Sequence, residues 1–375
     1  MRTNFYTAGL LFSLMLLFIT APVSGQSVWD GGDNLPVNPL TCPGENTENG
    51  LDAEPVEYNG AQPTNPPDLV GQSIVVVNIP QAISPAYDRA IEQGMVRAAG
   101  ELGNVEVLSS PSSVVSVSQQ AALDEYMFGG VHGILFAADD QENIAPNLRA
   151  ALDAGIHVIG YDSDTRNNAR EWFVQPVAYN AMAKALVDNL VEQAGPETGF
   201  AILTSNFDSP QAGRWIAEMS AYAAQCYPQL EWLETVETQS DGVLAYNQAS
   251  LMLGEYAGDL GGIISVTTTA TPQLAEAISQ NGACNRVAVV GVATPTEMRP
   301  YISNGCVQAA VLWDPAELGY AAIHVMRAAI DGALEPGATS VELGRLGAVA
   351  VMDGSNVLLG EPLIITAGNI NNLDF

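Results

Sequence analysis

Two aspartates, Asp162 and Asp164, are the residues of this chain whose type and spacing most directly suggest chemistry. They stand in the run Tyr-Asp-Ser-Asp-Thr, after the apolar segment 156–160, which is typical of a buried strand. In an open α/β sheet, the carboxyl end of a strand faces the ligand crevice. Carboxylates accept strong hydrogen bonds from hydroxyl groups, so this pair suits a neutral polyol. The alternative is an acidic turn in solvent or a helix cap.

The elements that would position these aspartates alternate between strand and helix. We expect strands at 72–79, 105–108, 133–138 and 156–160, separated by helices at 87–102, 116–128 and 143–154. Such alternation predicts a parallel sheet that is covered by helices on both faces.

The same alternation starts again after residues 171–176, which are expected to form a strand that leads out of the first set of elements. Strands are expected at 199–204, 230–235, 262–266, 287–291 and 307–313, with helices at 179–193, 211–227, 243–256, 272–280 and 315–331. The chain therefore forms either two α/β lobes around a cleft or one large sheet. The short join near residues 172–180 favours two lobes, with ligands where their strand ends face each other.

The composition is strongly acidic. Among 375 residues there are 42 acidic and 12 basic ones, which gives a formal net charge of −30, and Lys184 is the only lysine. Apolar residues make up 47% of the chain and aromatic ones 7%, which indicates a globular protein with an aliphatic core. The charge disfavours nucleic acid and anionic membranes as partners and argues against an anionic substrate.

The N-terminus is typical of a secretion signal. Arg2 precedes the apolar stretch 8–20, and small residues allow cleavage after Gly25, so we expect a signal peptide at 1–25 and a periplasmic or extracellular protein. Residues 26–71 are rich in Pro, Gly, Asn and Asp, and we expect an acidic, flexible leader there.

Four cysteines are available in an exported chain: Cys42, Cys226, Cys284 and Cys306. Cys284 and Cys306 each come just before an apolar strand, which makes them a candidate disulfide if those strands are parallel neighbours. Four cysteines allow three full pairings, so the connectivity stays open. There is no C-x-x-C motif and the three histidines are scattered, so we expect no metal site.

Motifs for cofactors and catalysis are missing from the sequence. It has no glycine-rich phosphate motif and no G-x-S-x-G elbow, so we expect no cofactor. The strand-end acids could form a glycosidase pair, but such an enzyme needs one acid in an apolar pocket, which a sequence does not reveal. We therefore expect a binding protein rather than an enzyme.

Four segments carry a resemblance to a known family, namely 154–165, 289–302, 311–320 and 369–375. They resemble the periplasmic sugar-binding proteins of ABC importers (type I, ribose-binding-like), in the branch of the autoinducer-2-binding and rhamnose-binding proteins. The likeness runs from about residue 72 to the end, and 289–302 and 311–320 are its most specific parts.

The resemblance implies two Rossmann-like lobes that are joined by a three-crossing hinge and close on a sugar. The first lobe would hold 72–176 and 315–344, and the second 177–314 and 345–375. A monomer in its closed form would dock on the membrane permease, and the ATPase of the importer would drive transport. A sensory role, in which the bound sugar is presented to a chemoreceptor, is a second class.

The resemblance also implies ligand-binding residues. Asp162 matches the ligand carboxylate of the family and Asp164 follows it in the same motif. Trp313 and Asp314 fall at the second crossing, where a stacking aromatic and a polar contact are expected, although Trp313 could instead be plain core packing. Gln175, at the first crossing, could contact the sugar or only cap the hinge.

Other positions depart from the autoinducer-2 pattern. Gln81 replaces a lysine, Gln211-Ala212 replaces Asp-Gln, and Val266-Thr267-Thr268 replaces Pro-Asp-Ala. Because Gln and Thr still hydrogen-bond hydroxyl groups, a sugar site survives while the autoinducer-2 contacts mostly do not. We therefore favour a neutral monosaccharide that is rhamnose-like or another pentose or hexose, and keep autoinducer-2 as the alternative.

Overall fold

The computed structural model describes residues 41–43, 57–81, 85–109, 116–207 and 209–375. The expected signal peptide, and the leader apart from 41–43 and 57–71, lie outside the described residues. No described helix is long and apolar enough to cross a membrane.

The first sheet contains eight strands, in the order β11-β12-β13-β5-β4-β3-β1-β2. They are β1 (Ile74–Ile79), β2 (Val105–Ser109), β3 (Gly133–Phe136), β4 (His157–Tyr161), β5 (Trp172–Val177), β11 (Ser340–Glu342), β12 (Ala348–Met352) and β13 (Asn356–Gly360). Strands β1 to β5 and β13 run parallel, and β11 and β12 extend the sheet as antiparallel strands. Strands β3, β4 and β5 are buried along their whole length, which explains their nearly continuous apolar sequences.

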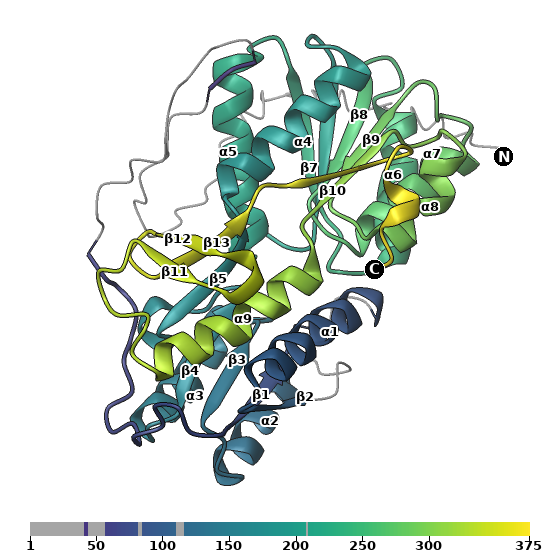
Figure 1. Cartoon of the computed structure of the whole chain (residues 1–375). Coiled ribbons are helices and arrows are strands. Elements are labelled where there is room, and N and C mark those ends of the chain that lie inside the picture. Colours follow the sequence, from purple (N-terminus) through teal and green to yellow (C-terminus); the bar gives the residue numbers. More distant parts are fainter. Residues whose placement is uncertain (1–40, 44–56, 82–84, 110–115, 208) are drawn as a thin grey trace, which may run out of the picture. The chain divides into compact units, whose positions relative to one another are not determined.

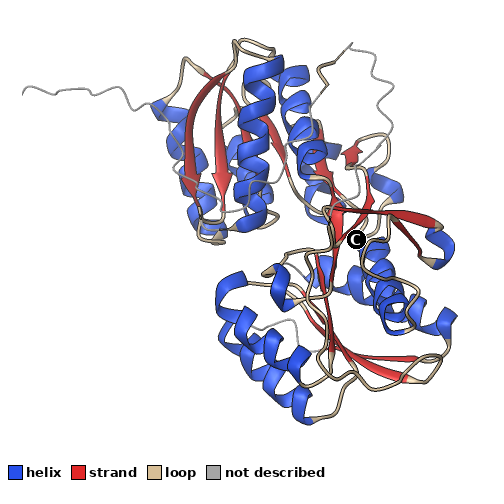
Figure 2. Cartoon of the chain, turned by 90° about the vertical axis from the view of Figure 1, so that its left-hand side faces the viewer, coloured by secondary structure: helices blue, strands red, loops and turns tan. Residues whose placement is uncertain are grey.

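Helices cover both faces of this sheet (Figures 1 and 2). Helices α1 (Pro85–Leu102) and α9 (Pro315–Ile330) pack together on one face, and α2 (Ser116–Phe128) and α3 (Gln141–Asp153) pack on the other. Glycine is required where α1 meets α9, because a Cβ atom on Gly94 would lie 1.9 Å from the Ala316 carbonyl oxygen. The close approach of the two helices holds the start of α9 beside α1.

The second sheet has the order β7-β6-β8-β9, all parallel. Its strands are β6 (Gly199–Thr204), β7 (Glu231–Glu237), β8 (Leu260–Ser265) and β9 (Ala288–Gly291), and an antiparallel pair, β10 (Ala309–Leu312) and β14 (Leu363–Thr366), joins through a bridge between Val292 and Val311. Its helices are α4 (Tyr179–Ala194), α5 (Pro210–Cys226), α6 (Gly242–Glu255), α7 (Ala270–Gln280) and α8 (Pro295–Ser303). Helix α8 was not predicted. It contains two prolines, but Pro295 occupies the tolerated first turn.

The predicted alternation of strands and helices is confirmed, and the chain passes between the two sheets three times. It leaves the first sheet after β5, returns between β10 and α9, and leaves again between β13 and β14. The expected boundary at 344/345 differs from the sheet membership, because β13 pairs with β5 and β12 pairs with β13 in the first sheet. Only the segment from β14 onward belongs with the second sheet.

The described part of the leader is packed against the first sheet, so the expectation of a flexible segment is wrong for residues 57–69. The Tyr58 ring lies 5.0 Å from that of Trp172, and its hydroxyl group donates to the Glu171 carbonyl oxygen at 3.0 Å. The backbone N–H of Ala61 donates to the Arg170 carbonyl oxygen at 2.8 Å. These long-range hydrogen bonds satisfy backbone and side-chain polar groups of the leader. A polar sequence with little apolar periodicity does not predict them.

Two disulfides connect the four cysteines. Cys284 and Cys306, which come before β9 and β10, are bonded with 2.02 Å between the sulfur atoms. Cys42 is bonded to Cys226 at the end of α5, so residues 41–43 are held on the second-sheet side. The second pairing had no sequence signal of its own.

Candidate functional site

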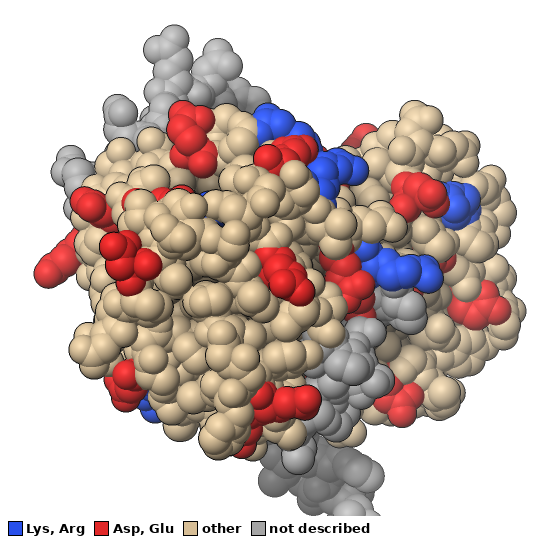
Figure 3. Space-filling model, turned by 60° about the horizontal axis from the view of Figure 1, so that its bottom comes forward, with Lys and Arg blue, Asp and Glu red and all other residues tan. Residues whose placement is uncertain are grey.

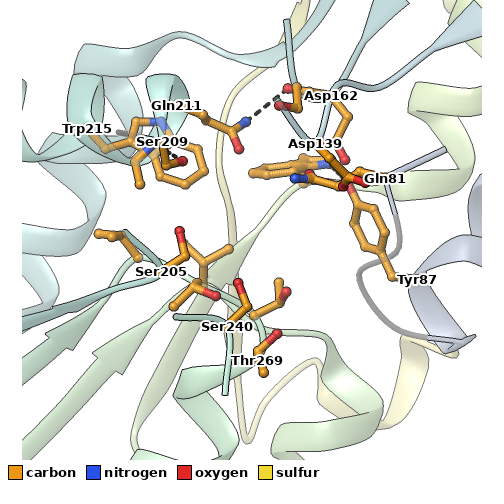
Figure 4. A pocket seen from close by; sticks show the side chains of 17 residues that line it. Gln81, Tyr87, Asp139, Asp162, Ser205, Ser209, Gln211, Trp215, Ser240 and Thr269 are labelled. Carbon is orange, nitrogen blue, oxygen red and sulfur yellow. Dashed lines mark hydrogen bonds between the residues drawn. The ribbon is translucent and has the colours of Figure 1, made fainter. Parts of the chain in front are cut away.

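A cavity of about 340 Å³ lies where the carboxyl ends of the two sheets meet (Figure 4). The first sheet and its helices contribute Gln81, Tyr87, Asp139, Asp162 and Ser163. The second contributes Ser205, Ser209, Gln211, Ala212, Trp215, Ser240, Val266, Thr267, Thr268, Thr269, Val292 and Trp313. Most of these residues follow the end of a strand, which is where parallel sheets place their ligands.

Asp162 is the most constrained residue of the cavity. It follows β4 directly, is 3% exposed, and has a φ of 62°, a left-handed conformation that residues other than glycine rarely adopt. Its N–H donates to the Val174 carbonyl oxygen at 3.3 Å, and its own carbonyl oxygen accepts from Gln211 Nε2 at 3.0 Å. Gln211 is in the first turn of α5, so this bond connects a helix of the second sheet with the loop that follows β4 of the first (Figure 4). Backbone strain held in this way is typical of functional sites.

The two carboxyl groups of the cavity are hard to ionise. Burial raises the pKa of Asp162 to about 7, a hydrogen bond from Tyr87 lowers it, and the nearby charge of Asp88 raises it. Burial also raises the pKa of Asp139 to about 6, while a hydrogen bond from Gln81 lowers it. Both carboxyl groups would gain from hydroxyl groups that donate to their charged forms.

Aromatic rings form an apolar part of the wall. The centroids of Trp215 and Trp313 lie 6.0 Å apart, and Tyr87 meets Trp313 edge-on at 6.3 Å. The indole Nε1 of Trp313 donates to the Tyr87 hydroxyl group at 2.9 Å. Indole rings of this kind pack against the C–H face of a sugar.

Hydroxyl side chains line the second-sheet wall, and they include Ser205, Ser240 and Thr269. In Figure 4 these three lie across the opening from Asp139 and Asp162. Ser240 also has a left-handed backbone, with a φ of 56°. Hydroxyl groups both donate and accept, so this wall can match sugar hydroxyl groups in either role.

The cavity lacks positive charge. Among its lining residues, all of which the structure describes, there is no Lys, Arg or His. Acidic side chains are also spread over the face of the molecule in Figure 3, where basic ones are fewer. The described residues contain no group of three or more His, Cys, Asp or Glu side chains that could hold a metal ion.

Six of the predicted site residues lie in the wall of this one cavity: Gln81, Asp162, Gln211, Thr267, Thr268 and Trp313. They come from loops that are far apart in the sequence and converge because parallel strands end at the same sheet edge. Trp313 combines both roles weighed for it, since it lines the cavity and is also packed and hydrogen-bonded in the core.

Three predicted ligand contacts, Asp164, Gln175 and Asp314, are not among the residues that line the cavity, and their contact with a sugar stays a prediction. The carboxylate of Asp164 is held by Arg170 through two bonds of 3.0 and 2.8 Å. Asp314 Oδ1 accepts from two backbone N–H groups, at 2.8 and 3.1 Å, and caps α9. The buried amide of Gln175 donates to the Val177 carbonyl oxygen at 2.9 Å.

Other lining residues were missed by the sequence analysis, above all Tyr87, Asp139, Ser205, Trp215 and Ser240. Asp139 and Ser205 come at or just after the end of an expected strand, as Asp162 does, so the same rule could have found them. Tyr87 and Trp215 stand in helices, where an aromatic residue is normally assigned to the core, and no local signal distinguished them.

The periplasmic binding protein domain family matches residues 74–334, and the chain belongs to this family. It is similar to the structure of a sugar ABC transporter protein from Actinomyces odontolyticus ATCC 17982, with 29% identity, 83% of this chain and 100% of the other covered, and a TM-score of 0.69. The predicted family and fold class, an α/β protein with mostly parallel sheets, are confirmed.

Two further structures share the fold at lower identity. One is an ABC transporter solute-binding protein from Clostridium phytofermentas with bound L-rhamnose. It is 22% identical, the match covers 81% of this chain and 98% of the other, and the TM-score is 0.73. The other is LsrB from Clostridium saccharobutylicum in complex with AI-2. It is 24% identical, the match covers 80% of this chain and 100% of the other, and the TM-score is 0.72.

Proposed function

We propose that this protein is the solute-binding receptor of an ABC sugar importer and holds one neutral monosaccharide in the cavity between its sheets. The observation that carries this proposal is the chemistry of the wall. Carboxylates, amides and hydroxyl groups surround paired indole rings, with no basic side chain among the lining residues. A sugar needs such a set of fixed partners for its hydroxyl groups and an aromatic surface for its C–H groups.

The ligand would be rhamnose-like or another neutral pentose or hexose. The similar structure that holds L-rhamnose supports this choice. Autoinducer-2 is the alternative, supported by the similar LsrB structure. It is the weaker candidate because this chain has Gln81 and Gln211-Ala212 at positions where the autoinducer-2 pattern has a lysine and an Asp-Gln pair.

The two sheets would act as lobes that close on the sugar by a hinge motion. The hinge would consist of the three passages between the sheets, near 178, 313 and 361. The closed form would dock on a membrane permease whose ATPase drives transport, so this chain would need no catalysis of its own. The family and the apolar N-terminal stretch support a periplasmic or extracellular location.

A thermal-shift screen followed by calorimetry tests the proposal. L-Rhamnose, other neutral pentoses and hexoses, and autoinducer-2 would be compared with sugar acids of matched size. A binding sugar at about 100 times its Kd should add about 2.7 kcal/mol to the free energy of unfolding. Sugar acids should give no shift, because the cavity offers no cation.

A matched pair of variants ties binding to the cavity. Asp162→Asn should weaken binding of the sugar that raises the melting temperature in the screen. Asp314→Asn, which changes a helix cap outside the cavity, should leave that affinity unchanged. If no neutral sugar raises the melting temperature at millimolar concentration, the proposed function is wrong.

A further inference from the structure

Three side chains form a chain of hydrogen bonds that ends at the carboxylate of the cavity. Trp313 Nε1 donates to the Tyr87 hydroxyl oxygen at 2.9 Å, and the Tyr87 hydroxyl group is hydrogen-bonded to Asp162. Indole N–H is only a donor, so it occupies an acceptor position of the phenol oxygen and leaves the phenol proton for Asp162. All three residues are buried, at 4%, 1% and 3% exposure.

The three residues come from three parts of the fold. Tyr87 is in the first turn of α1, Asp162 follows β4, and Trp313 lies in the passage between β10 and α9. The passage between the sheets is therefore connected to the carboxylate through a single hydroxyl group. Tyr87 is the member that touches both of the others.

The remaining titratable groups around Asp162 are acids and phenols. They are Asp88 of α1, Tyr161 of β4 and Asp139 after β3, and Glu92 of α1 lies near Tyr161. The guanidinium group of Arg170 is engaged by Asp164, and the Tyr161 hydroxyl group donates to Asn78 at 2.7 Å. No basic side chain lines the cavity, so a hydrogen bond has to stabilise the charge on Asp162.

We propose that Tyr87 is a positioning residue for the sugar: its hydroxyl group passes the hydrogen bond from Trp313 to Asp162, keeps that carboxylate charged near neutral pH, and makes sugar affinity depend on pH. This inference rests on the proposed function. A protonated Asp162 would lose much of its capacity to accept from a sugar hydroxyl group, and an ionised one accepts strongly.

The direction of the pH dependence follows from linkage. Burial raises the pKa of Asp162 to about 7, and the Tyr87 hydrogen bond lowers it. Sugar hydroxyl groups that donate to the charged form favour deprotonation, so affinity should be highest above this pH. Below it, affinity should fall by up to about tenfold per unit of pH.

The first experiment needs no sugar. Intrinsic tryptophan fluorescence of the full ligand-free chain is titrated from about pH 5 to about pH 9, since the indoles of Trp215 and Trp313 line the cavity. We expect a transition near neutral pH that is absent in Asp162→Asn. In Tyr87→Phe it should move to higher pH by about one unit, the size expected for losing a hydrogen bond to a charged group. An unmoved midpoint in Tyr87→Phe overturns the proposal.

A double variant tests the relay. Trp313→Phe keeps an aromatic ring and removes the donor, so it should shift the midpoint in the same direction by less. Combined with Tyr87→Phe it should add nothing, because the relay is already broken. Additive shifts would mean that Trp313 acts on Asp162 by another route, which contradicts the proposal.

The second experiment uses L-rhamnose as the probe in calorimetry, at about pH 6 and about pH 8.5. Tyr87→Phe should lose about tenfold in affinity at about pH 6 and recover most of it at the higher pH. An equal loss at both pH values would indicate a packing role only and overturn the proposal. A pH dependence that disappears in Asp139→Asn but not in Asp162→Asn would also overturn it. If L-rhamnose fails to bind at any pH, the choice of sugar is wrong, while the fluorescence titration still decides the role of Tyr87.

Discussion

Replacing Asp162 with asparagine should make the ligand-free protein more stable at alkaline pH, although it weakens sugar binding. The side chain is buried and its pKa is raised from 3.8 to about 7, because the protein interior disfavours its charge. The folded protein therefore holds this proton more tightly than the unfolded chain does. Asparagine has nearly the same shape, can accept the Tyr87 hydrogen bond, and never becomes charged.

The size of the effect follows from the difference between the two pKa values. An acid whose folded pKa is raised contributes stability below its unfolded pKa and loses that contribution as the pH rises through the folded pKa. For a shift from 3.8 to about 7, the full difference is about 4 kcal/mol. The variant should thus exceed the parent by about 4 kcal/mol at pH 8 and by about 2 kcal/mol at pH 5. For a chain of this size, 4 kcal/mol corresponds to about 5 °C in melting temperature.

Urea unfolding of the ligand-free proteins at both pH values measures this difference. Asp314→Asn is the matched control, because its carboxylate caps α9 outside the cavity and its stability difference should not change with pH in this way. If Asp162→Asn is less stable than the parent at pH 8, or if its advantage is equal at both pH values, Asp162 is not a desolvated, ionised carboxylate. The reasoning about the cavity would then be refuted.

Three further outcomes are expected away from the cavity. Asp314→Ala should lower the free energy of unfolding by about 1 kcal/mol through loss of the α9 cap, without changing sugar affinity in calorimetry. Replacing Cys284 and Cys306 by serine removes a disulfide that spans 22 residues, and urea unfolding should show a loss of about 3 kcal/mol. Arg170→Met should cost about 3–5 kcal/mol in the same assay, because it leaves the carboxylate of Asp164 without its buried partner.

The fold was largely predictable because its signals are local. Each buried parallel strand has a short apolar sequence, and most of the parallel strands are followed by a helix of ordinary length. The rule that strand ends meet the ligand predicted that Asp162 faces the crevice, and the family resemblance added Gln81 and Thr267, which line the same cavity. This rule depends only on the direction in which each strand runs, and the alternation of strands and helices determines that direction.

Side-chain direction and long-range pairing are the features that the sequence did not reveal. Asp162 and Asp164 share one loop, and the left-handed backbone at Asp162 together with Arg170, six residues after Asp164, decides which of them faces the cavity. No local pattern reveals that choice. Asp314 is different, since an aspartate before a proline at a helix start is a recognised cap signal, which the sequence analysis did not consider. The pairing of β13 with β5 joins segments far apart in sequence, and no strand pattern specifies such a partner.

The unfavourable features of Asp162 are connected. Its backbone is strained, its charge is desolvated, and its neighbours Asp88 and Asp139 are also acidic, in a chain whose net charge is −30. A fold selected only for stability would place an asparagine or a glycine there. The carboxylate has one advantage over both, which is that a bound sugar can donate hydroxyl groups to it and relieve the cost of its charge. The charge on Asp162 lowers the free energy of unfolding of the ligand-free protein, and a bound sugar restores part of it. The sugar should therefore stabilise this protein more strongly at alkaline pH than at acid pH.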